Sequence, residues 1–433
     1  MRNPIAELAA DPQATADRLA ALPQVPGVQV AGITAGTIRL GTAGTADAET
    51  GQAVTATTRF RPGSITKLLT AGLVMKCVND GKLALDDPVS RYVTGPWDDA
   101  LRVRHLISHS SGLDAADIFV DVGDDDGCIA RYIDQHVTRA SSLFPPGTTF
   151  SYCNGGFVLA GRVLEILLRQ PYEQALRTCL LDPAATTDTD FSPGHAAHHD
   201  PAAARGHLVK SDQPVPVPHR IEHPMCSRGL APAGGTLTST AHDLARLLTA
   251  HLQTPDTKTM RELHATAPGG VPGMRGAGLG WMVWDAPSLA SVRIGGAVPG
   301  QSGIIVADPT ADAVLIVLTN SDQGANAVSA LLDDTGAAAD QQTDPHRESP
   351  PTDLDRYTGR YTSHVSTLDI TLQPDGLRAT SEGLPDLTLT PQDRITFTSP
   401  IGPVAFVGFD DTNAPQYLRW RMRVWSRTAS TRH

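Results

Sequence analysis

Ser64 and Lys67 place a hydroxyl and an amine three residues apart, directly after a Pro-Gly turn and at the start of an apolar stretch with helical periodicity. If that helix forms, both side chains share one face of its first turn. A serine hydroxyl becomes a strong nucleophile when a neighbouring base accepts its proton, and burial lowers the pKa of a lysine toward that role. The pair therefore predicts nucleophilic acyl transfer, although the spacing alone also fits a surface serine and lysine.

Tyr152 and Asn154 follow a second Pro-Gly turn and precede a helical stretch at 156–168. Side chains two residues apart on an extended segment point to the same side, so the phenol and the amide can meet in one site. A phenol beside Lys67 can relay a proton, and an asparagine can hold a substrate carbonyl or the lysine. The alternatives are a half-buried aromatic residue at 152 and a turn or helix-capping asparagine at 154.

Three further segments complete a pattern with these two motifs: Arg104–Leu113, Ala233–Arg246 and Gly278–Trp281. Over about residues 25 to 330, the chain resembles the serine β-lactamase and penicillin-binding-protein superfamily, in its class C β-lactamase-like branch of esterases, D-alanyl-D-alanine carboxypeptidases and acyltransferases. The resemblance implies that Ser64 is the acylated nucleophile and Lys67 its base. It also implies that Tyr152 relays protons to the leaving group and from the acceptor, that Asn154 orients the substrate, and that no cofactor is needed.

The third active-site element of that branch is a Lys or His on an edge strand, followed two residues later by Gly. In the matching segment, 293–300, Ile294 stands at the position of the cation or imidazole. Arg293 is adjacent, but successive side chains on a strand point to opposite faces. Only a bulge or a shift of one residue would turn Arg293 toward the site.

The backbone of the same strand keeps its expected role. Gly296 stands at the glycine position, and by the resemblance the amide of Ala297 is the second oxyanion donor, beside the amide of Ser64. A backbone donor needs no particular side chain, so both residues remain candidate substrate-binding positions.

The isoleucine at 294 bears on the choice of substrate. A cation on this strand holds a substrate carboxylate through a charge-assisted contact worth about 1.5–3 kcal/mol. Ile294 cannot make that contact. We therefore expect weak β-lactam hydrolysis and small-molecule ester or amide substrates without a free carboxylate beside the scissile bond.

Turns and apolar runs predict an α+β fold. Short strand patterns occur at 28–32 and 37–40, helical patterns dominate from 65 to about 250, and strand patterns return at 278–284, 292–295, 303–307 and 313–320. Together with the resemblance, this order predicts a β-lactamase/transpeptidase-like antiparallel sheet flanked by helices, with an all-helical subdomain inserted.

Beyond this part, residues 336–352 have the composition of a linker. Short strand patterns then predict a small β-sandwich or lipocalin-like barrel. The expected organisation is a catalytic domain at 1–335, a linker at 336–352 and a β-domain at 353–433. The β-domain could wall off one side of the active site or mediate dimerisation, and the oligomeric state stays open.

Composition restricts the class of protein. The 433 residues carry a formal net charge of −11 with no basic run, which argues against nucleic-acid binding. No apolar run approaches the length of about 18 residues that a membrane span needs. Residues 1–24 lack the apolar core of a signal peptide, and the five cysteines have no disulfide or metal spacing. We therefore expect a cytoplasmic enzyme.

Two clusters resemble metal sites, and we expect neither to bind a metal. One lies in a Pro- and Ala-rich segment and contains His195, His198, His199, Asp200 and His207. The other, Asp124–Asp126, is not a calcium loop because Val122 and Ile133 fall where the first and twelfth carboxylates are required. We also expect His109 to be a hydrogen-bonded residue behind the site and not a general base.

The leading hypothesis is a serine acyl-enzyme catalyst that cleaves an ester or amide through Ser64 and passes the acyl group to water or to an amine. The resemblance includes relatives in natural-product pathways, such as antibiotic biosynthesis, that form amides without ATP. One alternative is a D-alanyl-D-alanine carboxypeptidase or β-lactamase. Another is a catalytically silent binding module, which Ile294 favours and the complete set of Ser64, Lys67, Tyr152 and Asn154 opposes.

Overall fold

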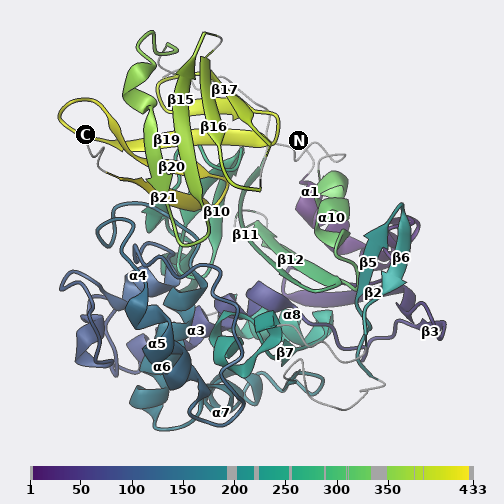
Figure 1. The fold of residues 1–433 in the computed structure, drawn as a ribbon. Helices are drawn as coiled ribbons and strands as arrows, with labels where there is room; N and C mark the ends of the chain where they lie inside the picture. Colours follow the sequence, from purple (N-terminus) through teal and green to yellow (C-terminus); the bar gives the residue numbers. More distant parts are fainter. Residues whose placement is uncertain are drawn as a thin grey trace.

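A computed structural model describes residues 3–192, 202–218, 224–252, 256–286, 289–308, 310, 312–332, 349–374, 376–383 and 385–428. One nine-stranded antiparallel sheet lies at its centre, and eight C-terminal strands close into a barrel, drawn in green and yellow in Figure 1. The predicted α+β class, with an antiparallel sheet flanked by helices and a C-terminal β-domain, is confirmed. Of the linker predicted at 336–352, the residues up to 348 lie outside the described ranges.

The central sheet has the strand order β3-β2-β1-β13-β12-β11-β10-β9-β8. Its strands are β1 (Gly27–Thr34), β2 (Thr37–Asp47), β3 (Gln52–Ala53), β8 (Ala265–Thr266), β9 (Met274–Ala277), β10 (Met282–Ala286), β11 (Leu289–Val298), β12 (Gln301–Asp308) and β13 (Ala313–Thr319). The strand predicted at 278–284 is wrong in its first half. Gly280 has φ +77°, a left-handed conformation that ends an extended segment, so a turn separates β9 from β10.

Helices cover both faces of this sheet. On one face lie α1 (Pro4–Ala10), α2 (Pro12–Ala20) and α10 (Gly324–Leu332); on the other lie α3 (Thr66–Asn79) and α8 (Ala241–Leu252). Strand β1 shows the alternation that such a sheet requires: Val28 and Val30 pack against the first group, and Ala31 and Ile33 against the second. Helix α3, which follows the turn that holds Ser64, is therefore buried against the sheet.

The predicted helical subdomain lies between α3 and α8. It contains α4 (Val103–Ile107), α5 (Cys128–Gln135), α6 (Asn154–Leu168) and α7 (Tyr172–Leu176), with a 3₁₀ turn at Val137–Arg139 between α5 and α6. The same part of the chain also holds two small ladders, β4 (Asp190–Phe191) with β7 (Leu237–Thr238), and β5 (His207–Lys210) with β6 (Gln213–Pro216). Helix α9 (Asp256–Arg261) follows α8. Among the described residues, no helix has the length and apolar character to cross a membrane.

The C-terminal strands form a closed barrel, which decides between the two predicted β-architectures. The strands are β14 (Gly359–Thr362), β15 (Thr367–Gln373), β16 (Gly376–Thr380), β17 (Leu387–Pro391), β18 (Thr396–Ser399), β19 (Gly402–Phe409), β20 (Pro415–Trp420) and β21 (Arg423–Arg427). Pairing of β14 with β21 closes it. The rings of Tyr357, Phe397 and Phe406 pack edge to face in its core.

Candidate active site

Ser64 lies in the 3₁₀ turn Gly63–Ile65, which leads directly into α3. The turn is packed tightly against strand β11. Gly63 has φ +54°, and a Cβ there would lie 2.8 Å from the backbone nitrogen of Ala297. Only glycine permits both this conformation and this approach. The Pro-Gly turn of the sequence motif therefore brings Ser64 directly against strand β11.

Lys67 is fully buried one helical turn away. Its Nζ lies 2.9 Å from Ser64 Oγ and 2.6 Å from the carbonyl oxygen of Ala233. It also lies over the ring of Tyr152, 5.0 Å from the centroid. Burial lowers the pKa of Lys67 well below its ordinary value, and the charge of Arg423 acts in the same direction. An unprotonated amine in contact with a serine hydroxyl can act as its base.

The hydroxyl of Tyr152 donates a hydrogen bond of 2.8 Å to Ser64 Oγ. Burial raises the pKa of this phenol, so it keeps its proton at neutral pH. The ring of His109 stacks on Tyr152 with centroids 4.3 Å apart, and its Nδ1 accepts a hydrogen bond from the N–H of Cys153. Burial lowers the pKa of His109 well below its ordinary value. His109 is thus a neutral ring that supports Tyr152 from behind.

Asn154 is the first residue of α6, and its side chain faces the same cavity as Ser64. Its Nδ2 donates a hydrogen bond of 2.6 Å to the carbonyl oxygen of Ala116. The helix cap is the preceding residue, Cys153, whose sulfur accepts from the N–H of Gly156. The sequence suggests two partners for Asn154, a substrate carbonyl or Lys67. Its side chain faces the cavity in which a substrate would bind. The amine of Lys67 contacts Ser64 and Ala233.

Strand β11 turns Ile294 toward the cavity and Arg293 away from it. The register of β11 with β12 is unbroken from Val292 to Val298, so no bulge rotates this segment. The guanidinium of Arg293 lies over the ring of Trp284, 4.6 Å from the centroid. Ile294 lines the cavity. Strand β11 consequently presents an apolar side chain where the motif has a cation.

The backbones of Ser64 and Ala297 lie in two segments that glycines allow to pack closely together. A Cβ at Gly296 would lie 2.7 Å from the nitrogen of Ser64, and one at Gly63 would lie 2.8 Å from the nitrogen of Ala297. A third glycine, Gly234, leaves room on the other side of the turn, where a Cβ would lie 2.9 Å from the nitrogen of Ser64. These close approaches pack the turn of Ser64 against the backbone of Ala297, and both residues line the cavity.

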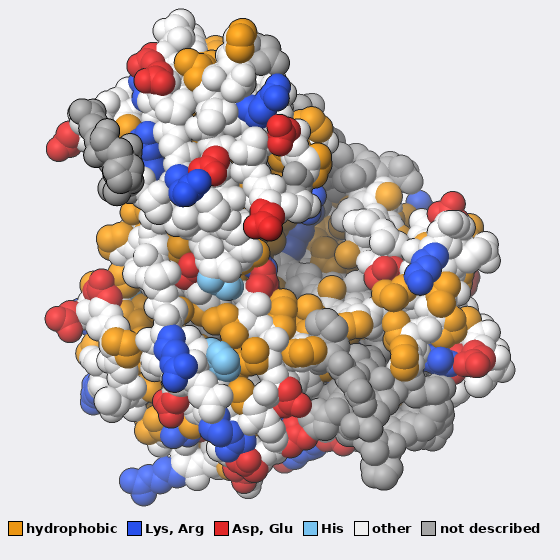
Figure 2. All heavy atoms as spheres, viewed as in Figure 1, with side chains coloured by type: hydrophobic (Ala, Val, Ile, Leu, Met, Phe, Trp, Pro, Cys, Tyr) orange, Lys and Arg blue, Asp and Glu red, His pale blue; other side chains and the backbone are white. Residues whose placement is uncertain are grey.

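The cavity at Ser64 has a volume of about 630 Å³. Figure 2 shows the surface hollowed below the barrel, with hydrophobic side chains along the border. Much of the described lining is apolar, and includes Phe119, Met225, Leu230, Met282, Ile294 and Met422. Among the described lining residues, Asp117 and Arg423 are the charged ones. Substrate therefore meets a largely apolar wall with one ion pair.

Arg423 is a cavity residue that sequence reasoning missed. It belongs to the barrel, at the start of β21, and its Nη2 donates to Asp117 Oδ1 at 2.6 Å. Burial lowers the pKa of Arg423 to about 10. No local signal marks this arginine among the others of β20 and β21, because only the docking of the barrel brings it to Ser64.

The two clusters that resemble metal sites in the sequence, around residues 195–207 and at residues 124–126, contain side chains that bind other protein groups. His195, His198, His199 and Asp200 lie outside the described residues. His207 is buried, with Nδ1 3.0 Å from the carbonyl oxygen of Asn320 and Nε2 accepting from the N–H of Ala48. Asp125 pairs with Arg131, and Asp126 with Arg228. In the described part of the chain, no group of three or more His, Cys, Asp or Glu side chains could hold a metal ion.

Comparisons with known proteins agree with this geometry. The Beta-lactamase family model matches residues 14–339. Penicillin-binding protein 4 of Amycolatopsis lactamdurans is 31% identical over 316 residues, which cover 68% of this chain and 81% of that protein. Esterase EstB of Burkholderia gladioli is 28% identical over 244 residues, 48% of this chain and 60% of EstB. The crystal structure of SurE with D-Leu matches with a TM-score of 0.78 and 27% identity, over 98% of this chain and 99% of SurE.

The family match extends over most of the chain and includes the motifs at Ser64 and Tyr152. The nearly complete structural match to SurE extends the likeness over the barrel as well. The chain therefore belongs to the beta-lactamase family, within the superfamily of serine β-lactamases and penicillin-binding proteins.

Proposed function

We propose that the protein is a serine acyl-enzyme catalyst that cleaves an ester or an amide through Ser64. One observation carries this proposal: Ser64 Oγ lies between a buried amine, Lys67 Nζ at 2.9 Å, and a phenol, the Tyr152 hydroxyl at 2.8 Å. A binding module has no use for a nucleophile in contact with both a base and a proton donor. The arrangement therefore favours catalysis over a silent binding role.

Acylation begins when Ser64 Oγ attacks the substrate carbonyl carbon and its proton passes to Lys67 Nζ. The new C–O bond moves an electron pair onto the carbonyl oxygen, where the amides of Ser64 and Ala297 stabilise the negative charge. The bond to the leaving group then breaks, and the leaving group takes the proton of the Tyr152 hydroxyl. Lys67 returns its proton to Tyr152, which restores both groups.

Deacylation uses the same groups with the acceptor in place of the leaving group. Water or an amine attacks the acyl-enzyme carbonyl and passes a proton to Tyr152 as the Tyr152 hydroxyl passes its own to Lys67 Nζ, which then protonates Ser64 Oγ as the ester bond breaks. Ser64 Oγ leaves with a proton, so the enzyme returns to its starting state. We propose an amine as the acceptor in the natural reaction, as in amide-forming natural-product biosynthesis, because an apolar cavity disfavours free water at the acyl-enzyme.

The substrate that fits this site is uncharged next to the scissile bond. Ile294 offers no charge-assisted contact, and the charge of Arg423 is offset by Asp117.

The likeness to SurE, crystallised with D-Leu, supports a D-configured residue on one of the reacting partners. The likeness to a penicillin-binding protein makes β-lactam recognition the second candidate. Ile294 argues against β-lactam recognition, because it cannot bind the carboxylate of a β-lactam.

We further propose that the enzyme works in the cytoplasm. All five cysteines are free in the described structure, and four of them are buried. Unpaired buried thiols suit a reducing compartment.

Intact-protein mass spectrometry after incubation with a fluorophosphonate tests the proposal. We expect one adduct, located on Ser64 by peptide mapping, and none on Ser64→Ala. Ser142→Ala is a matched control, because Ser142 is an exposed serine whose hydroxyl donates only a local hydrogen bond to Phe144. A wild-type protein that forms no adduct would support the binding module instead.

A further inference from the structure

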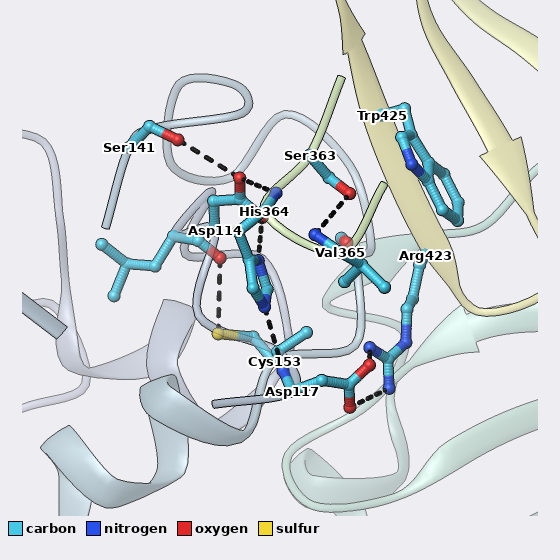
Figure 3. A network of polar contacts seen from close by, with 12 residues as sticks. Asp114, Asp117, Ser141, Cys153, Ser363, His364, Val365, Arg423 and Trp425 are labelled. Carbon is cyan, nitrogen blue, oxygen red and sulfur yellow. Dashed lines mark hydrogen bonds and ion pairs between the residues drawn. The ribbon is translucent and has the colours of Figure 1, made fainter. Parts of the chain in front are cut away.

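The barrel meets the catalytic part of the chain through polar contacts on the segment 114–117 (Figure 3). His364, in the turn between β14 and β15, contacts Asp114 twice. Its Nδ1 lies 2.5 Å from Asp114 Oδ1, and its backbone N–H donates to Asp114 Oδ2 at 2.7 Å. The backbone N–H of Asp117 donates to His364 Nε2 at 3.4 Å. One barrel residue therefore spans both ends of this segment.

Asp114 depends on these contacts because it is only 5% exposed. Ser141 Oγ also donates to it, at 3.2 Å. A buried carboxylate that loses a charge-assisted donor keeps the cost of its desolvation without the compensating bond. Without the imidazole, Asp114 stays buried with one donor fewer, so we expect it to move toward solvent and to release one end of the segment.

The segment between Asp114 and Asp117 also holds one side of the candidate active site. The carbonyl oxygen of Ala116 accepts from Asn154 Nδ2 at 2.6 Å, and that of Ala115 accepts from the N–H of Gly155 at 2.9 Å. The carboxylate of Asp117 pairs with Arg423 in the cavity wall. The contacts of His364 with Asp114 and Asp117 therefore fall on the two ends of the segment that fixes Asn154 and Arg423.

The chemistry of the two imidazole contacts is asymmetric. The Asp114 carboxylate accepts and the Asp117 N–H donates, so a neutral imidazole with its proton on Nδ1 satisfies both. Asparagine can place an N–H near the position of Nδ1 but does not reach that of Nε2. Glutamine reaches toward the position of Nε2 and leaves that of Nδ1 empty. Two isosteric substitutions can thus separate the two contacts.

We propose that His364 is a positioning residue of the active site: it holds the segment 114–117, and through Ala116 and Asp117 it orients Asn154 and Arg423. This inference rests on the proposed acyl transfer at Ser64, in which Asn154 orients the substrate. His364 touches no reacting atom. Its effect falls on the binding and alignment of a substrate that contacts Asn154, whereas the intrinsic reactivity of Ser64 depends on Lys67 and Tyr152.

The test compares His364→Ala, His364→Gln and His364→Asn with the wild type and with Ser363→Ala. Ser363 lies in the same turn, and its Oγ contacts the N–H of Val365, so this variant is a matched control. We expect His364→Ala and His364→Gln to lower kcat/KM for an N-acyl amino acid ester about tenfold, the effect of a modest misalignment. Fluorophosphonate labelling of Ser64 should stay within about twofold, because it needs no alignment by Asn154. His364→Asn should keep most of the wild-type kcat/KM, and Ser363→Ala should have the same kcat/KM as the wild type.

A double-mutant cycle distinguishes positioning from simple anchoring of the barrel. Because His364 acts through Asn154, His364→Ala should cause little further loss in an Asn154→Ala background. Hydrogen exchange gives a readout independent of catalysis: the amide of Gly155 should exchange faster in His364→Ala than in Ser363→Ala. If losses are fully additive, or if labelling and turnover fall together, His364 is a structural anchor and the inference fails. If wild-type Ser64 is not labelled at all, the proposed function fails, while the exchange experiment still decides whether His364 holds the segment.

Discussion

The backbone N–H of Tyr152 donates a hydrogen bond of 2.8 Å to the carbonyl oxygen of Met422, in the β20–β21 turn of the barrel. The residue whose hydroxyl contacts Ser64 is therefore held by the barrel through its own backbone. A neighbouring contact has the same effect, since the N–H of Val424 donates to Ser151 Oγ. The barrel is thus part of the framework that sets the geometry of Ser64 and Tyr152.

Tyr152→Phe removes the hydroxyl but keeps the ring on His109 and the backbone bond to Met422. We expect kcat to fall by about 10²–10⁴, the usual contribution of a proton-transfer group, with little change in thermal unfolding. The loss should be larger for an ethyl ester than for a p-nitrophenyl ester, because only the poorer leaving group needs a proton. Equal losses for both esters would mean that Tyr152 does not protonate the leaving group.

Ser64→Ala should reduce turnover about 10⁴-fold or more, and Lys67→Ala by a similar factor, because the nucleophile and its base act as one unit. The double variant should be no worse than either single one. Steady-state kinetics with an activated ester measure all three, and Ser142→Ala again serves as the control. If Ser64→Ala kept a tenth of the wild-type rate, Ser64 would not be the nucleophile.

The sequence predicts the parts of the site that depend on local geometry. Ser64 and Lys67 lie on one helix turn, and Tyr152 and Asn154 lie two residues apart on one segment, so spacing alone places each pair together. The structure brings both pairs to one cavity. The strands β1, β12 and β13 likewise lie where the apolar runs predict them.

Tertiary contacts account for what the sequence does not predict. Arg423 and His364 reach the site only because the barrel docks on the segments 114–117 and 149–152. No periodicity in the sequence encodes that docking. The turn at 278–281 depends on the positive φ of Gly280, which an apolar pattern does not reveal.

Ile294→Lys tests why this strand disfavours β-lactams. The lysine would face the cavity, as Ile294 does, and could hold a substrate carboxylate. A contact of about 1.5–3 kcal/mol predicts a gain of about tenfold or more in acylation by benzylpenicillin relative to an uncharged ester. Ile294→Val is the apolar control and should leave the ratio unchanged. Efficient penicillin hydrolysis by the unmodified enzyme, with kcat/KM of about 10⁴ M⁻¹s⁻¹ or above, would contradict this account of the strand.

The pH dependence of Ser64 labelling reports on Lys67. Burial lowers the pKa of Lys67, so the labelling rate should rise with pH through a midpoint well below the ordinary lysine value of about 10.4. Arg423 also lowers this pKa, so removal of its charge stabilises the ammonium form. Arg423→Gln should therefore move the midpoint to higher pH. Arg421→Gln, an exposed arginine in the adjacent turn, should not move it. A midpoint near 10.4 in the wild type would mean that Lys67 is not the base.

The choice between water and an amine as acceptor is decided at the acyl-enzyme. Water is present at about 55 M, so an amine at millimolar concentration wins only if the protein holds it and gains a large effective molarity. With preformed acyl-enzyme and increasing amine, the rate constant for release of the acyl group as amide should rise and saturate. D- and L-amino acid amides, compared as acceptors, show whether the bound amine is selected by configuration. A rate constant that rises linearly without saturation, or no amide with any amine tested, would mean that the protein does not hold the amine and would leave hydrolysis as the reaction. Saturation instead requires an occupied amine site beside Ser64, because free collision with the acyl-enzyme has no upper limit in this concentration range.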